Sequence, residues 1–156
     1  MRTVYRVLAY AVAVEVVVQA MAMVYGVAGL GKWVEDGGVF DKSVMESEEN
    51  PFPEVVGLII HGINGMLVIP LIALALLVVS FFVRIPGAAK WAGLVFLLVA
   101  LQITLGLSGH AVPAIGALHG LNALVLFSTA VVTARRARDV APGPASEPAA
   151  QLVTTD

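Results

Sequence analysis

The chain has 156 residues, of which 59% are hydrophobic and only 13% charged. A soluble domain carries about 25% charged residues, so this composition excludes an ordinary soluble protein and indicates an integral membrane protein. The chain has no cysteine, which excludes disulfides, zinc–thiolate sites and thiol catalysis.

The first apolar run covers about residues 4–30 and carries Glu15 and Gln19 in its interior. A membrane helix needs roughly 20 apolar residues, so this run is long enough to span a bilayer. It is too long for the apolar part of a signal peptide, and we expect it to be retained as a helix. A polar loop, residues 32–54, follows. It holds seven acids: Glu35, Asp36, Asp41, Glu46, Glu48, Glu49 and Glu54.

Three further apolar runs cover about residues 55–83, 91–112 and 114–134. Pro70 lies inside the second run and lacks the N–H that would bond to the Met66 carbonyl, so we expect a kink there. The very short connection before the last run predicts that the third and fourth helices are antiparallel neighbours. The remaining residues, 139–156, are rich in Pro, Ala, Ser and Thr and are predicted to form a disordered cytoplasmic tail.

These runs predict an all-α fold, an integral membrane up-down four-helix bundle within one domain of residues 1–138. Lys32 and Lys42 lie on one side of the predicted membrane. Seven basic residues lie on the other side: Arg2, Arg6, Arg84, Lys90, Arg135, Arg136 and Arg138. Because basic residues concentrate in cytoplasmic loops, we expect both termini in the cytoplasm and the acidic loop outside the plasma membrane.

Two short segments resemble each other and hold two of the three histidines in the chain. Residues 60–64 read Ile-His-Gly-Ile-Asn, and residues 118–122 read Leu-His-Gly-Leu-Asn. In the preceding helices Gln19 and Gln102 are each followed seven residues later by a glycine. The two copies predict a bundle built from a duplicated helix pair. The candidate site residues are His61, His119, Gly62, Gly120, Asn64, Asn122, Gln19 and Gln102.

The repeat places both histidines near the outer surface. At 1.5 Å per residue, His61 and His119 lie roughly 8–9 Å below it, with the two asparagines three residues deeper on the same helical face. The neighbouring glycines remove bulk, which would let a flat ligand or a helix come close. The two glutamines share the depth of the asparagines, where they would form a polar layer or orient the imidazoles.

Two neutral imidazoles at one depth can ligate a haem iron from both faces. We therefore hypothesise one b-type haem between the second and fourth helices, with its propionates paired to Lys32, Lys42 or His110. One alternative is that the histidines only hydrogen-bond across helices, at about 0.6 kcal/mol each. Another is a bare metal ion such as copper, although the methionines it would draw on (Met21, Met23 and Met66) are more often packing residues.

The Leu-His-x-x-Asn pattern of residues 118–122, after Gln102 in the third helix, resembles one four-helix half of haem A synthase. It is also similar to a family of small uncharacterised four-helix membrane proteins. The resemblance implies that His61 and His119 ligate one b-type haem. The glutamate-rich signature of the synthase and its second bundle have no match here, so electron transfer or haem handling is expected rather than haem hydroxylation.

The sequence thus favours a non-enzymatic haem-binding membrane protein that exchanges electrons with a quinone or a membrane redox partner. The alternative is a cofactor-free membrane accessory or scaffold protein. Membrane lipid is an expected partner and nucleic acid is not.

Glu15 would lie near the middle of the bilayer. It would act as a proton relay or quinol contact or, as we favour, it would be a neutral acid bonded to a neighbouring helix. The basic residues 135–138 are expected to anchor the topology and attract anionic lipid.

Overall fold

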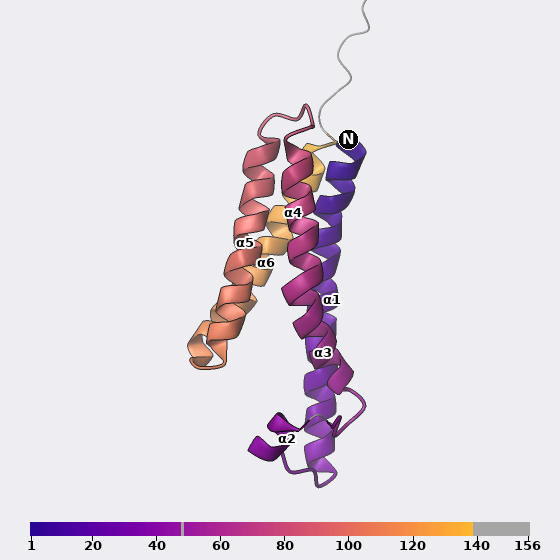
Figure 1. The fold of residues 1–156 in the computed structure, drawn as a ribbon, viewed down its shortest axis with the longest axis vertical. Helices are drawn as coiled ribbons and strands as arrows, with labels where there is room; N and C mark the ends of the chain where they lie inside the picture. The colour runs from indigo at the N-terminus through magenta and orange to yellow at the C-terminus, as the bar shows by residue number, and fades with distance from the viewer. Residues whose placement is uncertain (48, 139–156) are drawn as a thin grey trace, which may run out of the picture.

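The structure is a computed structural model that describes residues 1–47 and 49–138. Its helices are α1 (Arg2–Glu35), α2 (Lys42–Glu46), α3 (Val55–Ile63), the π-helical turn η1 (Asn64–Val68), α4 (Ile69–Ser80), α5 (Ala88–Gly109) and α6 (Pro113–Arg136). No strand occurs among these residues, so the predicted all-α class is confirmed. Four helical stretches are long and apolar enough to cross a membrane: 2–35, 55–80, 88–109 and 113–136. The predicted four-helix membrane bundle is therefore confirmed (Figure 1). The predicted tail, residues 139–156, lies outside the described residues.

The second membrane stretch consists of three segments, where the sequence predicted one helix with a kink at Pro70. A π-helical turn, η1, separates α3 from α4, and the N–H of Ile69 bonds to the Asn64 carbonyl five residues earlier. Pro70 stands in the first turn of α4 and has no N–H to continue an α-helical ladder. The irregularity thus begins at Asn64, six residues before the proline, and next to one of the candidate histidines.

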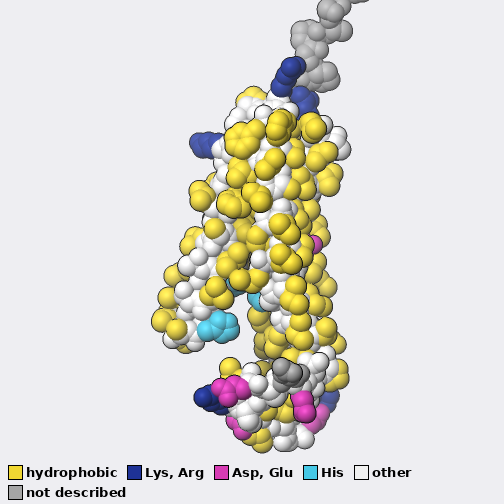
Figure 2. Space-filling model, viewed as in Figure 1, with side chains coloured by type: hydrophobic (Ala, Val, Ile, Leu, Met, Phe, Trp, Pro, Cys, Tyr) yellow, Lys and Arg dark blue, Asp and Glu magenta, His cyan; other side chains and the backbone are white. Residues whose placement is uncertain are grey.

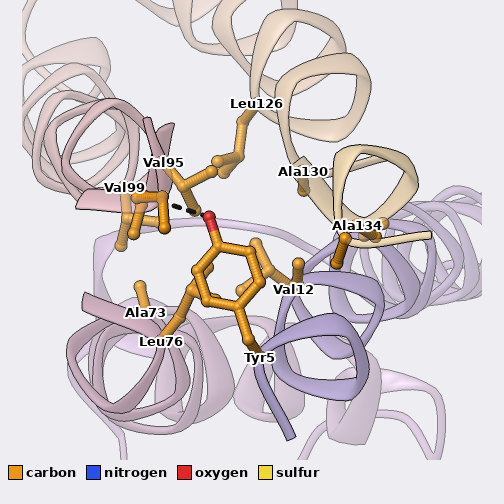
Figure 3. Close-up of a cluster of buried hydrophobic side chains, with 14 of the residues drawn as sticks. Tyr5, Val12, Ala73, Leu76, Val95, Val99, Leu126, Ala130 and Ala134 are labelled. Atoms are coloured by element: carbon orange, nitrogen blue, oxygen red, sulfur yellow. Dashed lines mark hydrogen bonds between the residues drawn. The ribbon is translucent and has the colours of Figure 1, made fainter. Parts of the chain in front are cut away.

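One end of the bundle, here called the closed end, has a continuous buried core (Figure 3). It is formed by residues 2–13, 69–80, 88–99 and 126–137. Alanines such as Ala9, Ala92 and Ala130 are fully buried there, and small residues let membrane helices approach closely. The Tyr5 hydroxyl donates a hydrogen bond to the Ala88 carbonyl at 3.0 Å, which satisfies its only buried polar group. All four membrane stretches are held together at this end.

At the other end, here called the open end, the helices form two separate pairs. It comprises residues 14–35, 55–63 and 102–125. There α3 packs on α1, and α5 packs on α6. Figure 1 shows the α5–α6 pair diverging from the pair of α1 and α3. The space-filling view shows a hollow between the two pairs, with histidine side chains beside it (Figure 2).

Glycines make the close approach within each pair possible. A Cβ added at Gly57 would collide with the Ala22 carbonyl oxygen and lie 2.9 Å from the Gly26 nitrogen. A Cβ at Gly109 would lie 2.9 Å from the Cα of Gly116. Backbone meets backbone at both places, so no rotamer change would relieve these contacts.

The acidic loop lies at the open end. α1 has 34 residues and is about 50 Å long, which exceeds the roughly 30 Å of a bilayer core, so it reaches into this loop. Asp41 caps the short helix α2 by accepting hydrogen bonds from Ser43 and Val44. The Ser43 hydroxyl donates a hydrogen bond of 2.6 Å to the Asp41 carboxylate. This bond is the main cause that lowers the pKa of Asp41 below its usual value.

We predict that Gly57→Ala lowers the free energy of unfolding by about 1–3 kcal/mol, because the added methyl group overpacks the α1–α3 contact. The control is Gly93→Ala in α5, where an added Cβ meets no atom within 4 Å. Alanine favours a helix by up to about 1 kcal/mol over glycine, so the control should be neutral or more stable. Thermal unfolding of the detergent-solubilised variants measures both. Equal stability of the two variants would contradict the close contact at Gly57.

Candidate histidine site

The two predicted histidines come together at the open end. His61 lies on α3 and His119 on α6, and their ring centres are 6.1 Å apart with an edge-on geometry of 60° between the planes. Both side chains are half-buried. The third histidine, His110, lies in the exposed connection between α5 and α6 and is not part of this pair.

Each imidazole is held by a backbone carbonyl of the partner helix in its own pair. Nδ1 of His61 lies 3.2 Å from the carbonyl oxygen of Gln19. Nδ1 of His119 lies 3.0 Å from the carbonyl oxygen of Gln102. A carbonyl oxygen only accepts, so Nδ1 must carry the proton in each contact. In the neutral ring Nε2 then keeps a lone pair, the arrangement in which histidine ligates a metal.

In the second pair, the side chains of Gln102 and Asn122 form a closed hydrogen-bond network. The Gln102 amide donates to the carbonyl of His119 at 3.0 Å and accepts a bond of 2.6 Å from Asn122. The Asn122 amide also donates to the Leu98 carbonyl at 3.0 Å. Asn122 is only 7% exposed, so these bonds satisfy an amide that has no water available. This network ties α5 to α6 directly beneath His119.

The first pair has the corresponding residues but a different network. The Asn64 amide donates to a carboxyl oxygen of Glu15 at 2.6 Å. Glu15 therefore has the partner on a neighbouring helix that we favoured from the sequence. The side-chain nitrogen of Gln19 is buried and has no hydrogen-bond partner among the described residues. The predicted polar layer of glutamines and asparagines is thus divided between the two pairs, and only the second copy is complete.

The glycines beside the histidines differ from those at the helix crossings. A Cβ added at Gly62 or Gly120 would meet no atom within 4 Å. Both glycines are exposed, so the close approach of a neighbouring helix expected for them is not found. Gly106 was missed in the sequence, although its Cβ would lie 3.1 Å from two atoms of the His119 ring. Gly106 precedes His119 by 13 residues in the sequence. Its position beside the ring could be recognised only after the crossing of α5 and α6 was known.

The three residues expected to meet haem propionates differ in their surroundings. Lys32 pairs with Asp36 at 2.7 Å, and Lys42 pairs with Glu46 at 3.4 Å. All four side chains in these pairs are more than 60% exposed. His110 is exposed and makes no such pair among the described residues. Within 1–47 and 49–138 there is also no group of three or more His, Cys, Asp or Glu side chains suited to a bare metal ion.

Comparison with protein-family models, curated proteins and solved structures finds no match for this chain. The chemistry of the site must therefore be argued from its own geometry. That geometry offers two imidazole rings beside a hollow, one from each helix pair. Each ring is oriented by a backbone carbonyl of its own pair.

We predict that Gln102 and Asn122 are energetically coupled, by about 0.5–1.5 kcal/mol in a double-mutant cycle of Gln102→Leu and Asn122→Leu. Either single change leaves a buried amide of the other residue without its partner. The control cycle combines Gln102→Leu with Ser128→Ala, because Ser128 is exposed and bonds only within its own helix. Chemical unfolding in detergent measures both couplings. A coupling near zero in the first cycle, or an equal one in the second, would contradict the network.

Proposed function

We propose that this protein is a membrane cytochrome that binds one b-type haem between His61 and His119. The observation behind the proposal is the placement of two imidazoles, from opposite helix pairs, with 6.1 Å between ring centres. An iron between two imidazole nitrogens, with bonds of about 2 Å, separates the ring centres by roughly 6 Å. The alternative that the histidines only hydrogen-bond across helices accounts for the contacts of both Nδ1 atoms with backbone carbonyls. The haem proposal adds a use for the two Nε2 atoms, which keep lone pairs.

The surroundings of the pair also fit a flat, apolar ligand. The space beside Gly62 and Gly120 is free of protein atoms within 4 Å of an added Cβ. The hollow between the helix pairs in Figure 2 is flanked mainly by hydrophobic side chains. An apolar pocket of this kind excludes water and tunes the potential of a haem held in it.

When bound, the haem supplies one-electron redox chemistry, and the residues of the chain hold and orient it. Gln19 and Gln102 act through their carbonyl oxygens, which fix the tautomer and the ring orientation of both ligands. His110 is the candidate partner for a propionate, since Lys32 and Lys42 already have acids beside them. The electron partner is a quinone or a membrane redox protein, so the role is electron transfer or haem handling without a reaction on a substrate.

We also infer that the bundle has up-down topology and arose from a duplicated helix pair. The support is that some corresponding residues make similar contacts in the two halves, although the networks of the side-chain amides differ. Each histidine bonds to the carbonyl of the repeated glutamine, and the repeated glycines, Gly26 and Gly109, both mark a close crossing. Asn64 and Asn122 each bond to the residue four positions before that glutamine, Glu15 in one half and Leu98 in the other.

The same proposal includes an orientation in the plasma membrane. In Figure 2 acidic side chains gather around the loop at the open end, while basic side chains predominate at the closed end, near the N-terminus. Under the positive-inside rule, the closed end and both termini face the cytoplasm, and the histidine site faces outward.

We expect the protein purified after haem-replete expression to show a Soret band that is lost in His61→Ala and in His119→Ala. Each change removes one of two iron ligands. The matched control is Ser128→Ala, a change at an exposed α6 residue that bonds only within its own helix and should leave the band in place. Absorption spectra of the oxidised and reduced protein give the result. No band in the unmodified protein would favour the cofactor-free scaffold, and a band that survives both ligand changes would show that the ligands are wrong.

Bulky substitutions at the two open glycines separate cofactor binding from folding. Gly62→Leu and Gly120→Leu should leave the unfolding temperature within a few degrees of the original, because a Cβ added at either glycine meets no protein atom within 4 Å. They should lower the haem content at least severalfold, since the leucine occupies space the ring needs. The measurements are thermal unfolding without haem and the haem-to-protein ratio. Full haem content in both variants would remove these glycines from the site.

A further inference from the structure

The closed end of the bundle presents a group of basic side chains at the membrane boundary. Arg84 lies in the turn between α4 and α5, and Lys90 lies in the first turn of α5. Arg135 and Arg136 end α6, and Arg138 follows directly after it. All five are exposed. Figure 2 shows basic side chains at this end without an acidic cluster beside them.

The charges at the two ends of the molecule are compensated differently. At the open end each lysine has an acid partner, Lys32 with Asp36 and Lys42 with Glu46. Among residues 1–47 and 49–138, no carboxylate forms a salt bridge with Arg84, Lys90, Arg135, Arg136 or Arg138. Their charge is therefore available to water or to an anionic partner.

Arg136 contacts an aromatic ring of the neighbouring helix. Its guanidinium lies 4.7 Å from the centre of the Trp91 ring, a cation–π contact between α6 and the start of α5. Tryptophan favours the headgroup region of a bilayer, which places Arg136 at that depth. A guanidinium that contacts a ring through its flat face keeps N–H donors free to form paired hydrogen bonds with phosphate.

We propose that the closed end binds anionic phospholipid, with the phosphate headgroup contacting Arg136 on Trp91 and the neighbouring Lys90 and Arg135. The lipid is favoured over a free anion because Trp91 sets the contact at the interface and because α5 and α6 expose apolar side chains beside it, such as Leu94 and Val132. Acyl chains pack against such side chains, whereas inorganic phosphate gains nothing from them. This site is independent of the histidines and of the proposed haem.

The test uses the full chain in a zwitterionic or non-ionic detergent and measures lipid binding by native mass spectrometry. Phosphatidylglycerol should bind at least tenfold more tightly than phosphatidylcholine, with an affinity that falls as salt is raised. Arg136→Gln should reduce phosphatidylglycerol binding on the order of fivefold. Arg136→Lys should also reduce it, because lysine keeps the charge but lacks the planar fork. Lys90→Gln, an exposed change at the residue before Trp91, should also weaken phosphatidylglycerol binding and supplies a second variant if Arg136→Gln folds poorly.

The matched control is Lys32→Gln with Lys42→Gln, which removes two positive charges from the opposite end and should leave lipid binding unchanged. The proposal is overturned if phosphatidylcholine binds equally well, or if the control loses as much binding as Arg136→Gln. It is also overturned if inorganic phosphate at millimolar concentration displaces the lipid, since the site would then recognise a free anion.

Discussion

The contact on which the candidate site depends is the close approach of the helices within each pair at glycine. Gly57 on Gly26, and Gly109 on Gly116, bring backbone against backbone. Only at this separation can an imidazole on one helix reach a main-chain carbonyl of the other, as His61 reaches Gln19 and His119 reaches Gln102. A polar side chain in hydrocarbon must find its partner within the protein. The close packing of helices at small residues therefore also orients the two histidines.

The two ends of the bundle differ in how their helices are held together. At the closed end, alanines and the Tyr5 hydroxyl join all four membrane stretches into one core. At the open end each helix is held mainly by one neighbour, so the two histidine-bearing pairs face each other across a hollow. A site between pairs can accept a ligand without disturbing the contacts that hold each pair together.

Much of the fold followed from the sequence, because length and apolarity alone identify helices that must satisfy their own backbone in lipid. The site was predicted in part. The repeated segments directed attention to His61 and His119, and Asn122 with Gln102 proved to be bonded partners. The carbonyl partners of the imidazoles and the role of Gly106 could not be predicted, because they depend on how two helices cross. Hydropathy does not give that crossing, since the buried and the lipid-facing sides of a membrane helix are both apolar.

The π-helical turn at Asn64–Val68 has a consequence for the first half of the molecule. A π-turn accommodates one residue more than the same length of α-helix, and one residue in an α-helix corresponds to a rotation of about 100°. The turn therefore sets the rotational phase of α3 relative to α4, and with it the direction in which His61 points. The α6 helix that carries His119 runs without such a turn. The direction of the His61 side chain consequently depends on the rotation introduced by the π-turn near Pro70. The direction of the His119 side chain depends on the uninterrupted α-helix of α6.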